Sequence, residues 1–218
     1  MSQRRRRRTQ QERVDESSRR LIAAAIELFA KNGYNETTAK EISLTAGYSR
    51  AMLSERFGSK RVILEAIMSE YESRSAGDLG AHPSGFDRVM ASVNGVCRVA
   101  LEDPGFTRAV SVMSFGAVHD EGDLRDRIRQ WLFGMRQTLC DALRAGVSDG
   151  SIDSAVDPDG VALKIMMAWA GFDFYWIVLP EFVDYVAGVH EWRQRIIDTL
   201  RPDVDSGARI ESPAVERD

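Results

Sequence analysis

Helical patterning runs through almost the whole chain, and it constrains the fold more than any other feature. Between residues 19 and 31, apolar side chains recur at the spacing that lines one face of a helix: Leu21, Ala24, Ala25, Leu28 and Phe29. Prolines at positions 104, 158 and 180 stand where helices can begin without losing a hydrogen bond. We find no run that alternates apolar and polar residues as a half-buried strand does. The sequence therefore predicts an all-α protein.

Capping residues and glycines divide this pattern into separate expected helices. Thr38 and Glu41 form a Thr-x-x-Glu capping box, and glycines at positions 33, 47 and 58 are placed to end helices. The expected helices are 19–31, 38–46, 51–57, 59–74, 86–102, 105–118, 123–146, 158–179 and 181–200. The expected domains are a flexible basic arm 1–15, a small helical domain 16–62, a larger helical domain 63–201 and a disordered polar tail 202–218.

The charge of the chain is divided unevenly along its length. The whole chain carries −4, but residues 1–74 hold 15 basic and 10 acidic side chains, whereas residues 75–218 hold 14 and 23. A basic N-terminal part favours polyanions, and an acidic remainder stays away from phosphates. The unbroken apolar stretches are far shorter than the ~18 residues of a membrane span, and no signal peptide is visible.

Two cysteines and three scattered histidines offer little for a disulfide framework, a metal site or catalysis. Cys97 and Cys140 have no second cysteine at metal-ligand spacing, and no histidine has a nearby second ligand. We find no nucleophile with its base and no paired carboxylates at catalytic spacing. We therefore expect a cytoplasmic protein that is not an enzyme and has no cofactor or metal.

The segment 37–60 has the spacing of a helix-turn-helix motif. Two short helices flank Gly47, a residue that suits a turn with positive φ, and Ala46 is small where the helices approach each other. Ile42, Leu53 and Phe57 can pack the two helices together. In such a motif the second helix enters the major groove of duplex DNA. The sequence therefore predicts a DNA-binding site here.

This part of the chain resembles the TetR family of transcriptional regulators. The matching residues within 18–64 are Leu21, Ala24, Ala25, Leu28, Phe29, Gly33, Tyr34, Thr37, Thr38, Ile42, Ala46, Gly47, Tyr48, Ser49, Leu53, Phe57, Ser59, Lys60 and Leu64. The resemblance implies an all-α homodimer whose three N-terminal helices bind DNA and whose C-terminal half binds a small inducer and dimerises. Members of the family commonly have Tyr where this chain has Ser54.

Candidate DNA contacts come from the outward face of the second helix and from basic residues around it. A five-arginine run can act as an arm on phosphates or in the minor groove, and Lys60 lies at a helix N-terminus that favours anions. The candidates are Arg4, Arg5, Arg6, Arg7, Arg8, Thr38, Ser49, Arg50, Ala51, Met52, Ser54, Glu55, Arg56 and Lys60. The arm also has a simpler interpretation as a solvated tail.

The acidic half is rich in methionine and aromatic residues, which suit an adaptable apolar pocket as well as a core. The candidate ligand contacts are Met113, Phe115, Trp131, Met135, Met166, Trp169, Phe172 and Asp173. For Asp173 we weigh two roles, a carboxylate that orients a ligand and, slightly favoured, a partner of an arginine. The segment 158–179 is apolar on two faces, so that one face can meet a partner subunit.

The last two expected helices are the candidate dimer interface, as the resemblance also implies. The candidate interface residues are Met167, Phe174, Phe182, Val186, Val189, Arg193, Ile196 and Ile197. Together these features predict a ligand-responsive regulator, most simply a repressor, that binds an inverted-repeat operator as a homodimer and is released by a small hydrophobic or amphipathic inducer. The alternatives are a constitutive DNA-binding or architectural protein without an inducer and, least favoured, an all-α enzyme.

Overall fold

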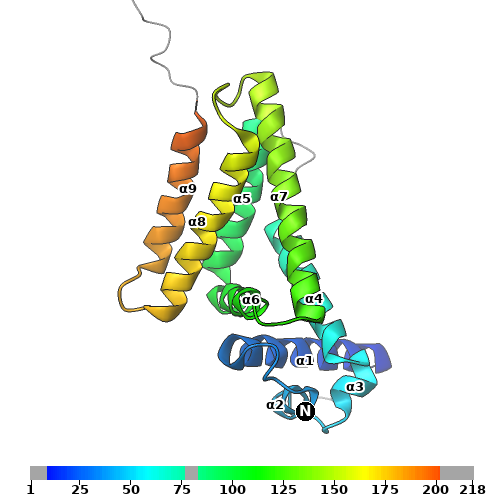
Figure 1. Ribbon diagram of the computed structural model, residues 1–218. Coiled ribbons are helices and arrows are strands. Elements are labelled where there is room, and N and C mark those ends of the chain that lie inside the picture. Colours follow the sequence, from blue (N-terminus) through cyan, green and yellow to red (C-terminus); the bar gives the residue numbers. More distant parts are fainter. Residues whose placement is uncertain (1–8, 77–82, 202–218) are drawn as a thin grey trace, which may run out of the picture.

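The computed structural model describes residues 9–76 and 83–201 as an all-α protein (Figure 1). Its described helices are α1 (Gln10–Asn32), α2 (Ala39–Thr45), α3 (Met52–Phe57), α4 (Lys60–Ser75), α5 (Gly85–Glu102), α6 (Pro104–Gly116), α7 (Asp123–Asp149), α8 (Pro158–Val178) and α9 (Tyr185–Leu200). The predicted fold class is confirmed. The arginines at positions 4–8, residues 77–82 and the tail 202–218 lie outside the described residues.

The helices form a small N-terminal unit beneath a longer bundle. Figure 1 shows α1, α2 and α3 at the lower end and α4 rising from them, while α5, α7, α8 and α9 run alongside one another above. The helix α6 crosses between the two parts and packs on α1. The bundle thus covers one side of the first three helices, and their other side is free.

Helix boundaries follow the capping residues closely. Thr38 caps α2 in a complete box with Glu41, and Asp157 caps α8 with Pro158 in the first turn. The expected start of the first helix at residue 19 was wrong, because Thr9 and Glu12 form a second capping box that starts α1 at Gln10. Residues 10–15, which we assigned to the flexible arm, are therefore helical.

Two further boundaries differ from expectation. The helix α9 begins at Tyr185 rather than 181, since Asp184 rather than Pro180 precedes its first turn and accepts a hydrogen bond from the Ala187 amide. The helix α7 continues past Gly146 and ends at Gly150, whose φ of 76° marks a left-handed cap.

Gly146 serves a packing role inside α7 rather than ending it. A Cβ built on Gly85, at the start of α5, would lie 1.9 Å from the Gly146 backbone nitrogen. A Cβ on Gly146 would in turn lie 2.4 Å from the Ile152 side chain. These two glycines therefore allow the backbones of α5 and α7 to approach more closely than any other residue would permit.

Two hydrophobic clusters form the core. The first joins α1 to α4 with α6 and the beginning of α7, through buried side chains such as Phe29, Leu53, Phe106 and Met113. The second joins α5, α7, α8 and α9. Since the first cluster draws from both parts of the chain, the N-terminal unit shares its core with the bundle.

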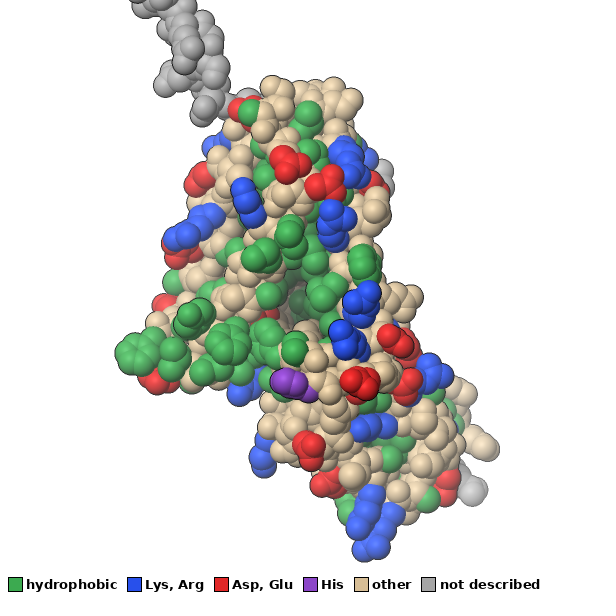
Figure 2. All heavy atoms as spheres, in the orientation of Figure 1, with side chains coloured by type: hydrophobic (Ala, Val, Ile, Leu, Met, Phe, Trp, Pro, Cys, Tyr) green, Lys and Arg blue, Asp and Glu red, His purple; other side chains and the backbone are tan. Residues whose placement is uncertain are grey.

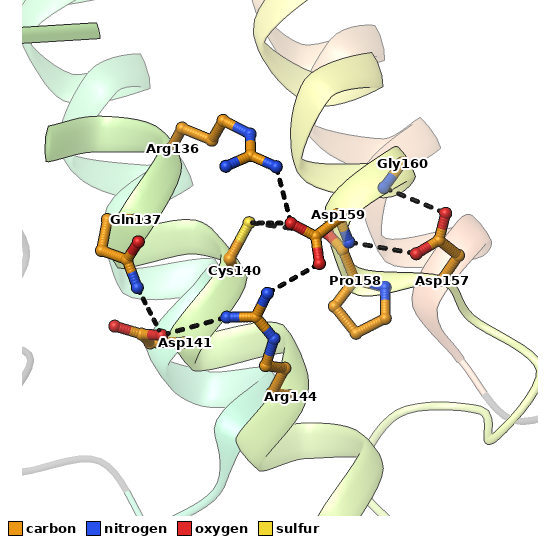
Figure 3. A network of polar contacts seen from close by, with 9 residues as sticks. All are labelled: Arg136, Gln137, Cys140, Asp141, Arg144, Asp157, Pro158, Asp159 and Gly160. Atoms are coloured by element: carbon orange, nitrogen blue, oxygen red, sulfur yellow. Dashed lines mark hydrogen bonds and ion pairs between the residues drawn. The ribbon is translucent and has the colours of Figure 1, made fainter. Parts of the chain in front are cut away.

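A polar network holds the beginning of α8 against α7 (Figure 3). The Asp159 carboxylate accepts hydrogen bonds of 2.6 Å from both Arg136 and Arg144 of α7, and Asp157 accepts from the amides of Asp159 and Gly160. The arginines hold the pKa of the Asp159 carboxyl below its ordinary value, chiefly through the hydrogen bond from Arg144. This network fixes the register of α8 on α7 at one end of the bundle.

Candidate functional site: a helix-turn-helix surface and an internal cavity

The turn between α2 and α3 is built by one glycine and one buried serine. Gly47 has a φ of 80°, a conformation that residues with a Cβ rarely adopt, as the sequence predicts. The Ser43 hydroxyl donates to the Ala39 carbonyl and accepts from the Leu53 amide at 3.0 Å. Ser43 therefore satisfies an amide in the first turn of α3, which has no side-chain hydrogen bond from its own N-cap residue, Ala51.

The helix α3 presents a mixed polar face. Leu53 is fully buried, and the side chains of Ser49, Arg50, Ala51, Ser54 and Glu55 are exposed. Among the described residues Arg50 has no hydrogen-bond or ion-pair partner, so its guanidinium is free to meet a base or phosphate. Met52 and Arg56 are half-buried, and Met52 packs against the first cluster instead of lying fully outward.

Lys60 has a different environment from the one we expected. Its ammonium donates to the carbonyl oxygens of Tyr34 at 2.7 Å and Thr37 at 2.9 Å, and it lies 4.1 Å from the centre of the Tyr34 ring. Burial lowers its pKa. Lys60 thus ties α4 to the loop after α1, and a phosphate contact would have to compete with these carbonyls.

A cavity of about 630 Å³ lies inside the bundle and is bounded by α4, α5, α7, α8 and α9. Figure 2 shows a hollow on this face between α7 and α8, with hydrophobic side chains around it. Four of the expected ligand contacts line the cavity, namely Trp131, Met135, Met166 and Trp169. Since α4 supplies one wall and begins shortly after the end of α3, the cavity and the DNA-binding unit share an element.

The other four expected ligand contacts lie outside this lining. Met113 is fully buried in the first cluster, and Phe115 packs edge-on against Phe174 at 5.7 Å. Phe172 is stacked on Tyr185, 5.5 Å between ring centres. Sequence reasoning also missed lining residues, chief among them Tyr71, Glu72 and Arg127, because it considered only apolar stripes in the C-terminal half.

No arginine in the described part of the chain pairs with Asp173, so the favoured interpretation of its role was wrong. It is 2% exposed, and one carboxylate oxygen accepts a 2.6 Å hydrogen bond from Ser111, whereas no described residue donates to the other at hydrogen-bond geometry. Burial raises the pKa of the Asp173 carboxyl to about 7, opposed by the nearby Ser111 hydroxyl and Trp169 indole.

Arg127 connects α7 to α4 at the cavity wall. Its Nε donates to Glu65 at 2.8 Å and a terminal nitrogen donates to Glu72 at 2.9 Å. The arginine side chain is 6% exposed, but the two carboxylates are 44% and 39% exposed. All three side chains line the cavity.

An apolar strip runs along α8 and over the turn into α9. Its exposed members are Leu163, Met167, Phe174, Val178, Phe182 and Val186, and we call this set the α8 strip. Figure 2 shows hydrophobic side chains gathered over the lower ends of α8 and α9. The other expected interface residues lie elsewhere: Val189, Ile196 and Ile197 belong to the second cluster, and Arg193 donates to Asn94. In a helix apolar on all sides, sequence periodicity does not reveal the exposed face.

The length and composition of α8 would also allow it to cross a membrane, and 22% of its most apolar 18-residue segment is buried in the protein. A helix that packs in the core of a protein can be equally long and apolar. Lys164 and Asp173 interrupt the apolar sequence of α8, and the Asp173 hydrogen bond to Ser111 ties it to α6.

Comparison with known proteins matches both parts of the chain to one family. Residues 21–67 match the model of bacterial regulatory proteins of the tetR family, and residues 85–175 match a tetracyclin repressor-like C-terminal domain.

Two relatives and one solved structure agree with these family matches. An uncharacterised HTH-type transcriptional regulator, YvkB of Bacillus subtilis, is 26% identical over 63% of this chain and 71% of its own length. The HTH-type transcriptional regulator TtgR of Pseudomonas putida is 24% identical over 85% of this chain and 92% of its own length. A transcriptional regulator from Saccharomonospora viridis, solved in complex with choline, has the same fold, with a TM-score of 0.66. It is 21% identical, and the match covers 84% of this chain and 95% of that chain. The chain is a DNA-binding regulator rather than an enzyme, and it belongs to the TetR family of transcriptional regulators.

Proposed function

We propose that this regulator is a ligand-responsive repressor, which binds an inverted-repeat operator as a dimer and is released when a small molecule occupies the cavity. The observation that carries the proposal is the position of α4. This helix begins at Lys60, directly after α3, and its residues Tyr71 and Glu72 form part of the cavity wall. A ligand in the cavity therefore touches the element that leaves the DNA-binding unit.

In the proposed complex, α3 lies in the major groove. Arg50 is suited to a bidentate contact with guanine, Ser54 can donate or accept at a neighbouring base edge, and the Glu55 carboxylate can accept there. Ser49 and Arg56 would contact the DNA backbone beside α3, and Thr38 would do so with a hydroxyl that also donates to the Glu41 carboxylate at 2.7 Å. The arginines at positions 4–8 would extend this surface as a basic arm.

The proposed dimer forms through the α8 strip, with a second copy of the chain as its occupant. A two-fold interface presents the same surface on both subunits, and an exposed apolar face is covered when two copies meet. Two copies of α3 would then face successive major grooves, roughly 34–36 Å apart. This geometry is the reason to expect an inverted-repeat operator.

The proposed response depends on the separation of the two α3 helices. A ligand shifts this equilibrium only if it binds one separation better than the other, and couplings of ~1–3 kcal/mol are typical. By reciprocity, operator DNA would weaken ligand binding by the same factor. The remaining alternative is a constitutive DNA-binding protein, for which a cavity of about 630 Å³ beside α4 has no role.

Selection of bound sequences from a random duplex library tests the proposal. We expect enrichment of an inverted repeat with half-sites one or two helical turns apart, bound by a dimer. With that duplex, compounds that raise the melting temperature of the protein should weaken DNA binding. Met135→Trp, which reduces the cavity, should blunt this effect and leave DNA affinity intact. Selection of single half-sites, or ligands that leave DNA affinity unchanged, would contradict the repressor model.

A further inference from the structure

The cavity carries a negative charge that its one basic residue does not balance. The charged residues in its lining are Glu65, Glu72 and Arg127, and among the described lining residues there is no lysine or histidine. Arg127 divides its hydrogen bonds between the two carboxylates, so its charge is already engaged. Glu65 also lies 4.0 Å from Arg61, which lies 4.0 Å from Asp123, so that these three carboxylates and two arginines, taken as ionised, sum to −1. Electrostatic energies are larger in a partly buried site than in water, so this excess favours a ligand of positive charge.

Aromatic rings surround the same space. Tyr71 and Trp131 meet edge-on with ring centres 5.6 Å apart, and Trp169 and Trp192 lie 4.7 Å apart. All four line the cavity. The faces of indole and phenol rings attract cations, and tryptophan does so most strongly. Apolar walls and excess carboxylate charge therefore coincide.

Among the described residues, Trp192 brings a buried and unpartnered polar atom to the cavity wall. Trp192 is 9% exposed and lines the cavity, and its indole nitrogen has no hydrogen-bond acceptor. Buried polar groups in folded proteins are normally satisfied by protein, water or ligand. This indole N–H is therefore a buried polar group of the cavity wall that no described residue satisfies.

We propose that the cavity selects an organic cation, with an ammonium-type group carried on an aromatic or aliphatic body. The cationic group lies near Glu72 and Glu65, and the body lies among the tryptophans and Met135 and Met166. This inference rests on the proposed function, because it assigns a ligand class to the same cavity. An anionic ligand would need Arg127 to leave both carboxylates and would then face their unpaired charges.

Binding of a cation here also affects the ionic contact between α7 and α4. A cation near Glu65 and Glu72 competes with Arg127 for the two carboxylates that join α7 to α4. Occupancy therefore weakens the ionic contact between the bundle and the helix that leads to α3. In this way the charge of the ligand, and not its bulk alone, acts on the DNA-binding unit.

Three matched compounds test the charge preference. They share one phenylbutyl body and end in a trimethylammonium group, a tert-butyl group or a carboxylate. Binding to the full chain is measured by tryptophan fluorescence and by calorimetry. We expect the ammonium compound to bind at least tenfold more tightly than the neutral one, and the carboxylate to bind most weakly. Equal affinities, tightest binding of the carboxylate, or no binding of any compound would overturn the proposal.

Variants that remove a carboxylate charge from α4 test whether Glu72 and Glu65 cause the preference for the ammonium compound. Glu72→Gln should weaken binding of the ammonium compound about five- to tenfold and leave the neutral compound unchanged. Glu65→Gln is a second variant of the same kind, in case one of them destabilises α4. Glu70→Gln is the matched control, because Glu70 is exposed on the same helix and does not line the cavity. Equal losses in the control and in Glu72→Gln would contradict the assignment.

The same compounds separate this inference from the proposed function. If the ammonium compound binds preferentially but leaves operator affinity unchanged, the ligand class stands and the repressor model fails. If another class of compound releases the operator while the ammonium compound does not bind, the repressor model stands and the ligand class fails.

Discussion

Asp173 is the described carboxyl whose protonation is most altered by folding. Its folded-state pKa of about 7 lies above the ordinary value of 3.8, so the folded state holds a proton that the unfolded chain has lost over that interval. Stability from this residue is therefore present at low pH and decreases as pH rises from about 4 to about 7. Three pH units at 1.36 kcal/mol each give an upper limit of ~4 kcal/mol.

We predict that Asp173→Asn removes this loss of folding stability at rising pH. The amide keeps the size of the side chain and can accept the Ser111 hydrogen bond, but it carries no charge. The melting temperature of the variant minus that of the parent should increase from pH 5 to 7 and level off by pH 8. Because the variant and the parent share all other carboxyls, the difference in melting temperature cancels the contributions of groups such as Asp149 and Asp159, whose pKa values are lowered. A constant difference would show that Asp173 titrates normally.

Arg50 is the side chain on α3 whose replacement should change sequence preference. Its guanidinium is exposed and unpartnered among the described residues, so Arg50→Ala should leave the fold intact. We predict a loss of ~1–3 kcal/mol in operator affinity and relaxed preference at one base position, measured by fluorescence anisotropy against single-base variants. Arg195→Ala, which removes an exposed arginine from α9, is the control. Uniform weakening across all sequences would instead assign Arg50 to a phosphate.

At the scale of helices, capping residues made most boundaries predictable. The Thr38 box and the prolines at 104 and 158 stand where the structure begins α2, α6 and α8, because these side chains satisfy the free amides of a first turn or need none. The start of α1 was missed although Thr9 and Glu12 carry the same signal, since the apolar stripe begins later at Leu21.

Which faces of the C-terminal helices point inward was less predictable. The segment 158–178 is apolar all round, so its sequence alone does not distinguish Met166, in the cavity wall, from its exposed neighbour Met167. The polar cavity residues Glu72 and Arg127 gave no signal of their own, because each resembles an ordinary exposed charge until α4 and α7 are packed together. The contact between these two side chains depends on how α4 and α7 pack in the folded protein.

The close contact of α5 with α7 gives a prediction at this scale. Gly85→Ala should destabilise the protein by several kcal/mol, because the added Cβ would meet the backbone of Gly146 rather than a movable side chain. Gly134→Ala in the middle of α7 meets nothing within 4 Å and should be neutral or stabilising by ~0.5–1 kcal/mol. Urea unfolding measures both. Equal stability of the two variants would mean that α5 shifts at no cost.

For the whole molecule, the α8 strip sets the expected assembly. Phe182, 79% exposed, should be covered in the dimer, so that Phe182→Glu gives monomers and greatly weakened operator binding. Phe133→Glu alters a comparably exposed phenylalanine on α7, outside the strip, and should leave the dimer unchanged. Light scattering at micromolar concentration distinguishes the outcomes. A parent chain that is monomeric under these conditions would contradict the prediction.

The core shared by α1 to α4, α6 and the beginning of α7 limits how the molecule can be divided. Residues of α6, including Phe106, Val110 and Met113, cover the side chains of the first helices. A fragment that ends after α4 would lose this cover and present part of its interior to water. We therefore expect the excised DNA-binding unit to be an incompletely packed fragment, with helical circular dichroism but poorly dispersed NMR signals. Evolutionary exchange of such units between proteins would accordingly need to retain a matching α6.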